Sequence, residues 1–227
     1  MKPLNNYISE RLNPKHLGFK DTLPEKLKEK YKLTYNRETG RYDCDGDIKI
    51  KYDLIDDEGH FICNFGVIKG GFNCSGCKSL ISLKGAPKEV GGNFCCYNCE
   101  NLESLKGAPE KVGRIFDCSR CIKLKSLEGA PEKVGMDFFC NYCLGLKTLE
   151  GAPEEVGGWF DCSNCLKLKT LEGAPKEVSE NFDCRECKDL ESLEGAPEEV
   201  GGWFDCRYCP KLKDYDINTK IRGDLYK

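Results

Sequence analysis

Cysteine is the residue type in this chain with the clearest chemical potential. Of the 227 residues, 17 are cysteines, and 14 of these form Cys-x-x-Cys pairs. Two such pairs can hold a zinc ion, and a single pair can form a disulfide or a redox-active dithiol. The first cysteines of the pairs recur every 22 residues: Cys74, Cys96, Cys118, Cys140, Cys162, Cys184 and Cys206. This regular spacing indicates that the pairs belong to a structural repeat.

Three chemical interpretations of the pairs can be compared. A zinc ribbon needs two facing pairs, whereas a repeat makes the pairs parallel neighbours and leaves one of seven without a partner. Equivalent cysteines on stacked coils would lie about 4.8 Å apart, farther than the roughly 3.8 Å between the Cβ atoms of a disulfide. No β-α-β context supports a thioredoxin-like site. We therefore favour free thiols that fill narrow core positions, and a zinc-stabilised repeat protein is the alternative.

One cysteine stands apart from the pairs. Cys95 lies between Phe94 and Cys96, so the alternation of a strand predicts that its side chain points outward. It is the candidate for a reactive thiol.

The elements that position the cysteines follow from the repeat itself, whose skeleton is V-x-x-x-F-x-C-x-x-C-x-x-L-x-x-L-x-G-A-P. Phe-x-Cys alternates like a short strand, and Gly-Ala-Pro forces a turn. One unit buries four large apolar side chains, worth about 1.5–3 kcal/mol each, against roughly 30 kcal/mol for ordering the unit. The units must therefore stack. The sequence predicts a β-rich solenoid with a short-stranded parallel sheet on its concave side and turns, 3-10 pieces and exposed Lys/Glu runs on its convex side.

The core F-x-C-x-x-C-x-x-L resembles the leucine-rich repeat L-x-L-x-x-N/C-x-L, in its cysteine-containing variant. The second cysteine of each pair falls on the Asn/Cys position, where that family builds a ladder inside the coil. The resemblance covers residues 68–212 and implies a right-handed coil. Val-x-x-x-Phe is one residue longer than the usual L-x-x-L, and Gly-Ala-Pro leaves no room for a convex helix. The repeats also resemble those of uncharacterised proteins of large tailed bacteriophages.

The chain divides into three parts on this pattern. Residues 1–67 form an N-terminal α/β capping region, residues 68–212 contain seven 22-residue repeats, and residues 213–227 form a C-terminal cap.

The ends of the chain are less regular than the repeats. Asp21-Thr22-Leu23-Pro24 predicts a helix start, but Pro24 to Asn36 also matches the repeat skeleton, so the alternative is a degenerate first repeat. Tyr42-Asp43-Cys44 is similar to the Phe-Asp-Cys of the repeats. Tyr226 falls on the next Phe position, which predicts a capping strand over residues 221–226.

The outward residues of the predicted sheet are the candidate binding residues. Exposed Trp, Tyr and Arg side chains are typical of interaction hot spots, and a column of aspartates would repel itself until a basic partner or a cation relieves it. The alternative is that the tryptophans only pack together and the aspartates form a solvated edge. The candidates are Trp159, Trp203, Phe139, Tyr97, Tyr142, Tyr208, Asp117, Asp161, Asp183, Asp205, Arg185 and Arg207.

Composition narrows the class of function. The net charge of -3 and the pI of about 5.7 give no positive field for nucleic acid or membranes. The absence of a secretory or transmembrane pattern predicts a cytoplasmic protein, with a virion as one setting. The two histidines, His16 and His60, form no catalytic set, and we expect neither an enzyme nor a cofactor. The expectation is a scaffold that binds a protein partner on its concave face. The oligomeric state stays open.

Overall fold

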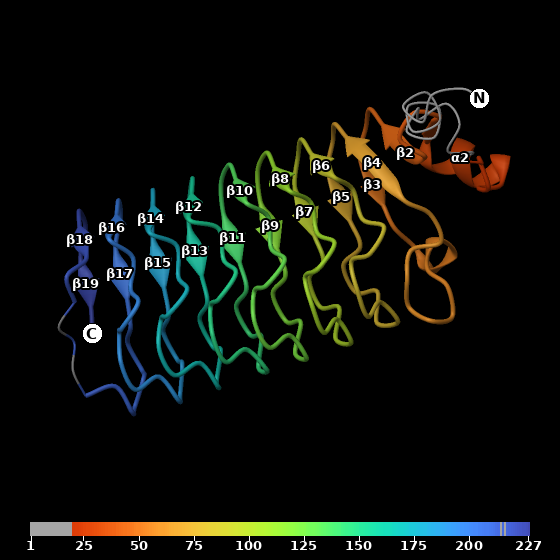
Figure 1. Cartoon of the computed structure of the whole chain (residues 1–227). Helices are drawn as coiled ribbons and strands as arrows, with labels where there is room; N and C mark the ends of the chain where they lie inside the picture. Colours follow the sequence, from red (N-terminus) through yellow and green to blue (C-terminus); the bar gives the residue numbers. More distant parts are fainter. Residues whose placement is uncertain (1–19, 214, 216) are drawn as a thin grey trace, which may run out of the picture.

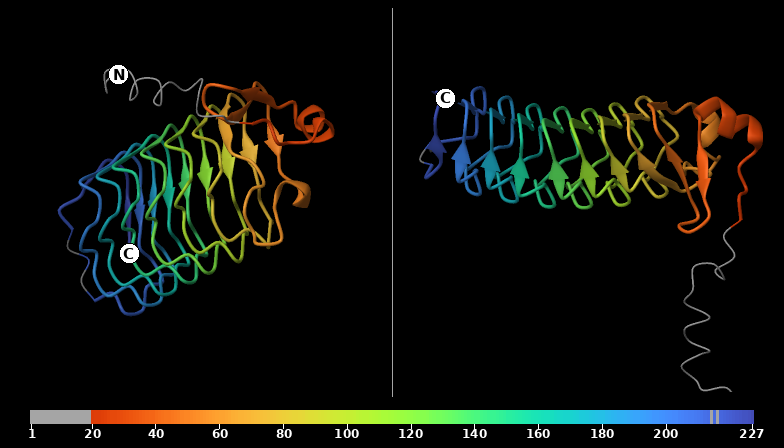
Figure 2. Two further views of the ribbon diagram at one scale, coloured as in Figure 1. Left: turned by 45° about the vertical axis from the view of Figure 1, so that its right-hand side comes forward. Right: turned by 90° about the horizontal axis from the view of Figure 1, so that it is seen from above.

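The structure, a computed structural model, describes residues 20–213, 215 and 217–227. These residues wind into a β-solenoid with two sheets of short, almost entirely parallel strands (Figure 1). The coils stack along one axis, with the N-terminal helix at one end and the C-terminus at the other (Figure 2). The predicted solenoid with a parallel sheet is therefore confirmed. Of the predicted N-terminal cap, residues 1–67, the structure describes residues 20–67.

The nine-stranded sheet is formed by the Phe-x-Cys segments. Each phenylalanine pairs in register with that of the next coil, as Phe138 does with Phe160. From Phe72 to Phe204 the rings form one buried stack with centroids 4.9–5.5 Å apart. The strands are β3 (Ile48–Lys49), β5 (Phe72–Asn73), β7 (Phe94–Cys95), β9 (Phe116–Asp117), β11 (Phe138–Phe139), β13 (Phe160–Asp161), β15 (Phe182–Asp183), β17 (Phe204–Asp205) and β19 (Leu225–Tyr226).

The ten-stranded sheet adds to what the sequence predicts. The Glu-Val and Lys-Val dipeptides after Gly-Ala-Pro form strands, with valine buried and the charged residue outward. The sequence places these charged runs on turns, because a two-residue strand has no periodicity to detect. The strands are β1 (Thr34–Asn36), β2 (Arg41–Cys44), β4 (Phe65–Ile68), β6 (Glu89–Val90), β8 (Lys111–Val112), β10 (Lys133–Val134), β12 (Glu155–Val156), β14 (Glu177–Val178), β16 (Glu199–Val200) and β18 (Lys220–Ile221).

A glycine marks the corner between the two sheets in most coils. A Cβ atom on Gly113 would lie 2.2 Å from the carbonyl oxygen of Gly91 in the preceding coil. A side chain at Gly113 would therefore require the neighbouring backbones to move apart. Ser179 takes the equivalent position in one coil. Inside the coil the core consists of the phenylalanines, cysteines, leucines and valines of the repeat, nearly all without solvent exposure.

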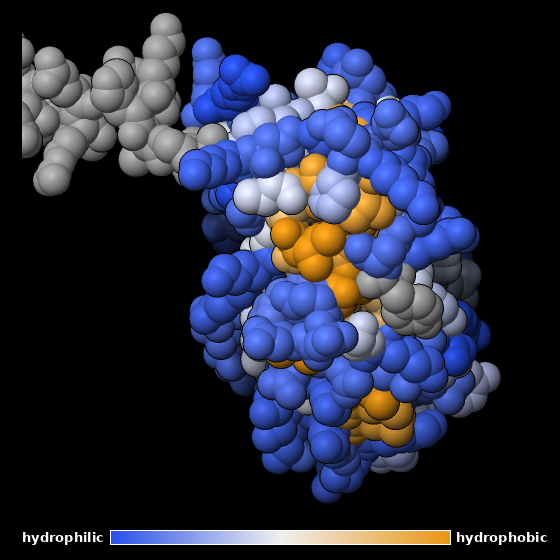
Figure 3. Space-filling view, turned by 90° about the vertical axis from the view of Figure 1, so that its right-hand side faces the viewer, coloured by the Kyte–Doolittle hydropathy of each residue, from blue (hydrophilic) through white to orange (hydrophobic). Residues whose placement is uncertain are grey.

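The N-terminal end is closed by non-repeating elements. Helix α2 (Glu25–Tyr31) begins after Pro24, which confirms the predicted helix start and shows that the degenerate-repeat alternative is wrong. After it, β1 and β2 pair antiparallel. Seen from this end, the surface is mostly hydrophilic, with apolar side chains gathered near its centre (Figure 3).

In the first coil, the Tyr42-Asp43-Cys44 segment does not take the place that its similarity to Phe-Asp-Cys predicts. Tyr42 pairs with Phe65, so the Tyr42–Cys44 segment joins the ten-stranded sheet and is not a Phe-x-Cys strand. Ile48 instead pairs with Phe72 and takes the phenylalanine position. A short 3-10 helix, η2 (Tyr52–Leu54), follows.

The last coil is one residue shorter than the others. Glu199 pairs with Lys220, 21 residues on, and Phe204 pairs with Leu225. Leu225 therefore holds the phenylalanine position and Tyr226 the outward one, so the predicted place of Tyr226 is wrong. The expected capping strand is present as β18 and β19, one in each sheet.

Candidate binding face

The outward side of the nine-stranded sheet carries two columns of side chains, one before each phenylalanine and one after it. Side chains alternate along a strand, so these residues point away from the core that phenylalanine and the first cysteine fill. Parallel pairing in register places the members of a column about 4.8 Å apart. Most of the predicted binding residues lie in or beside these columns.

An aromatic patch forms on this face from Phe139, Trp159, Trp203 and Tyr226. Trp159 contacts Phe139 with ring centroids 5.9 Å apart and Trp203 with centroids 5.5 Å apart, both edge to face. Tyr226 extends the series at 6.2 Å from Trp203. Both indoles are half-buried. The two tryptophans and Phe139 thus lie on one face as predicted, and the contact between the indoles also fits the alternative that they pack together. The structure adds Tyr226, which the shortened last coil turns outward.

The aspartate column is not the solvated edge that the sequence suggests. Asp161, Asp183 and Asp205 are only 8%, 0% and 1% exposed, and Asp117 is half-buried. Each carboxylate turns back toward its own chain and accepts a hydrogen bond from the backbone N–H two residues later, at 2.8–3.0 Å. The column therefore forms the turns after the strands. The prediction of an exposed acidic column is wrong for these three residues.

Burial sets the charge state of this column. It raises the pKa of Asp117 and Asp161, and it raises the pKa of Asp183 to about 7. Burial also acts on Asp205, but hydrogen bonds from the Arg207 guanidinium outweigh it and lower the pKa. The carboxylate of Asp183 is thus partly protonated near neutral pH, whereas that of Asp205 is ionised.

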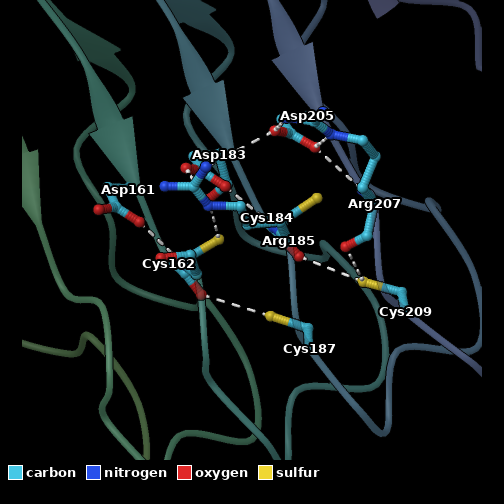
Figure 4. Close-up of polar contacts among 10 residues, drawn as sticks. Asp161, Cys162, Asp183, Cys184, Arg185, Cys187, Asp205, Arg207 and Cys209 are labelled. Carbon is cyan, nitrogen blue, oxygen red and sulfur yellow. Dashed lines mark hydrogen bonds and ion pairs between the residues drawn. The ribbon is translucent and has the colours of Figure 1, made fainter. Parts of the chain in front are cut away.

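The two predicted arginines lie over the buried carboxylates (Figure 4). Arg207 donates from Nε and Nη2 to the two oxygens of Asp205, at 3.0 and 2.6 Å. Arg185 Nε lies 3.2 Å from Asp183 Oδ2 without hydrogen-bond geometry, and among the described residues this oxygen accepts no hydrogen bond. The arginines therefore compensate the column unequally, and Asp183 is the member left short of a partner.

Tyrosines and arginines form the rim of this face. Arg207 lies 4.8 Å from the ring centroid of Tyr226 and 6.0 Å from that of Tyr208, which is 67% exposed. Arg120 lies similarly between the rings of Tyr97 and Tyr142, at 5.9 and 4.9 Å, distances at which cations attract aromatic rings. Arg120 is absent from the predicted set, although it lies four residues after a repeat phenylalanine, the position that Tyr142 and Tyr208 hold in their own coils.

The cysteine pairs form a ladder of thiol hydrogen bonds inside the coil. In the six pairs from Cys96/Cys99 to Cys206/Cys209, the second thiol donates to the carbonyl oxygen of the first cysteine in the preceding coil. Cys187 Sγ, for example, lies 3.4 Å from Cys162 O, and Cys209 Sγ lies 3.3 Å from Cys184 O (Figure 4). All 17 cysteines are free, and burial raises the pKa of thiols such as Cys162 well above its usual range. These thiols act as buried donors.

Cys95 is only half-buried and points outward, in agreement with the alternation of its strand. Burial, reinforced by the nearby carboxylate of Asp117, raises the pKa of its thiol to about 11. A thiol with so little thiolate at neutral pH is a weak nucleophile.

Ligand-type residues for a metal gather in one loop outside the repeats. Within the described part of the chain, Asp56, Glu58 and His60 are the only His, Cys, Asp or Glu residues that bring three ligand atoms within 4.8 Å of one another. Asp56 Oδ1 already accepts hydrogen bonds from the backbone N–H groups of Glu58 and His60. The zinc alternative for the cysteine pairs stays a prediction, and His16 lies outside the described residues.

Comparison with known protein families, with characterised proteins and with solved structures finds no match for this chain. Among the described residues, no helix has the length and apolar character that crossing a bilayer requires.

Proposed function

We propose that this protein is a non-catalytic scaffold that binds a protein partner on the outward face of its nine-stranded sheet. The observation that carries the proposal is the aromatic patch of Phe139, Trp159, Trp203 and Tyr226, half-exposed on a regular frame. Clustered aromatic residues bordered by arginine are the composition of interface hot spots.

The patch is not needed to fill the core. The stacked phenylalanines already fill the inner side of the same strands without solvent exposure. The indoles lie on the other side of the sheet, where they contact each other, Phe139 and Tyr226. In addition, Trp159 Nε1 is shielded from solvent yet donates no hydrogen bond to any described residue. An unsatisfied donor of this kind costs about 1–3 kcal/mol, and a partner that supplies an acceptor would relieve that cost if the indole turns Nε1 outward on binding.

The second part of the proposal is a relation of the repeats to a known repeat family. The thiol ladder supports a relation to the cysteine-containing leucine-rich repeat, because the second cysteine occupies the ladder position and bonds to the neighbouring coil. The second parallel sheet is a departure from that family's expected pattern. The setting that we propose is a phage virion or a contact between a phage and its host, on the resemblance of the repeats alone.

The test is affinity capture from extracts of the native host with three versions of the full chain. Wild type and a Leu144→Ala/Leu166→Ala control should recover the same partner, whereas Trp159→Ala/Trp203→Ala should lose it. The control removes two apolar side chains that lie outside the nine-stranded sheet, Leu144 and Leu166, which are 38% and 37% exposed. Equal recovery by the tryptophan variant, or loss by the control alone, would place the contact elsewhere and refute the proposal.

A further inference from the structure

The outward residues of the ten-stranded sheet show an unusual order of charges. Four consecutive strands of the sheet, β8 to β14, each present one exposed charged side chain: Lys111, Lys133, Glu155 and Glu177. Lys111 pairs in register with Lys133, and Glu155 with Glu177. Two lysines therefore lie side by side, followed by two glutamates.

This order does not serve the single chain. Like charges directly opposite on neighbouring strands are destabilising. At both ends of this strip opposite charges pair in register, as Glu89 does with Lys111 and Glu199 with Lys220. Glu177 also pairs with Glu199, but Lys220 and Arg222 form ion pairs with the Glu199 carboxylate.

The four residues themselves are mostly without partners. Lys111 reaches Glu89 at 3.4 Å, but Lys133, Glu155 and Glu177 have no ion-pair partner within 4 Å in the described part of the chain. Their charges are therefore available to another molecule.

We propose that the molecule that covers this strip is a second copy of the chain. The order Lys-Lys-Glu-Glu is complementary to itself when reversed. A two-fold axis parallel to the strands, between β10 and β12, places Lys133 opposite Glu155 of the second copy and Lys111 opposite its Glu177. Symmetry repeats both contacts, which gives four opposite-charge contacts in one isologous interface. The same axis sets Glu89 opposite Glu199 of the second copy, but each of these carboxylates already has a lysine of its own chain within 3.4 Å.

The surface around the strip leaves room for these side chains. A groove of about 670 Å³ runs along the sheet, with a floor that includes Gly113, Gly135 and Gly157. The glycines are imposed by the close backbone approach at the corner, since a Cβ on Gly135 would lie 2.2 Å from Gly113 O. The uncovered backbone gives the aliphatic stems of the second copy's lysines and glutamates a surface to lie on. This interface uses a different sheet from the aromatic patch, so it does not depend on the proposed function.

The test is the oligomeric state of the full chain by sedimentation velocity over a range of concentrations at low salt. Wild type should dimerise, and salt at about 1 M should weaken the dimer because the screening length falls to roughly 3 Å. Lys133→Glu and Glu155→Lys should each raise the dissociation constant by roughly tenfold or more, because like charges then meet twice. An equimolar mixture of the two variants should restore the dimer, since one contact is then reversed in sign and the other is native.

Matched controls lie in the same two coils. Lys123→Glu and Glu150→Lys reverse exposed charges that have no ion-pair partner among the described residues and lie outside both sheets. They should leave dimerisation unchanged, and thermal unfolding of every variant verifies that it is folded. The proposal is overturned by a wild type that stays monomeric, by a dimer that ignores salt or either reversal at the strip, by a dimer that the controls weaken equally, or by a mixture that fails to reassociate.

Discussion

Replacement of Asp183 by asparagine should stabilise the protein at high pH and have little effect at low pH. The side chain is fully buried, one of its oxygens accepts no hydrogen bond, and burial raises its pKa to about 7. In the unfolded chain an aspartate has a pKa of about 3.9. The folded state therefore binds the extra proton between these two pH values, and wild-type stability falls as pH rises through them.

The size of the effect follows from the shift. Three pKa units correspond to roughly 4 kcal/mol, at 1.36 kcal/mol per unit. Asp183→Asn removes the titrating group but keeps an acceptor for the Arg185 N–H. At pH 8 the free energy of unfolding of the variant should therefore exceed that of wild type by up to about 4 kcal/mol, and the difference should vanish near pH 4. Loss of the ion pair with Arg185 reduces this difference.

The assay is guanidinium unfolding followed by tryptophan fluorescence at several pH values between about 4 and 8. Asp205→Asn, one coil away in the same column, is the control with the opposite sign. Hydrogen bonds from Arg207 lower the pKa of Asp205, so its stabilising effect is present at neutral pH and is lost as pH falls through the folded pKa. If Asp183→Asn is as destabilising as Asp205→Asn at pH 8, or if its effect does not change with pH, the reasoning fails.

Three further predictions concern the repeat frame. Phe138→Ala should lower the free energy of unfolding by about 3–5 kcal/mol, measured by chemical denaturation, because the ring is fully buried within the phenylalanine stack. Gly107→Ala should lower the free energy of unfolding by more than about 2 kcal/mol, because the φ of Gly107 is +93° and a Cβ would lie 2.7 Å from the carbonyl oxygen of Leu83. Gly76→Asn should lower it by less than about 1 kcal/mol, because no atom lies within 4 Å of a Cβ at Gly76. Iodoacetamide should label the native protein slowly, even at Cys95, and should label all 17 thiols once the protein is denatured. Bound zinc in a metal analysis of the purified protein would contradict the free-thiol interpretation.

Much of the candidate binding face could be located from the sequence, and part of it could not. The alternation around phenylalanine placed Trp159 and Trp203 on one face, because strand geometry alone fixes which side a residue takes. The same alternation says nothing about how a side chain bends after it leaves the strand. The aspartates turn back to their own backbone, as Asp183 does to the Arg185 N–H, and so become buried.

The amino-acid sequence by itself determined the period, the inward residues and the turns. Their causes are local: an apolar alternation, a glycine or proline at each corner, and a unit too small to be stable unless it stacks. Only the tertiary structure decided the second sheet, the contact of Trp159 with Trp203 across an intervening coil, and the register of Leu225 at the C-terminal end. These features depend on which residues of neighbouring coils pair with each other, and that register is set only when the coils stack.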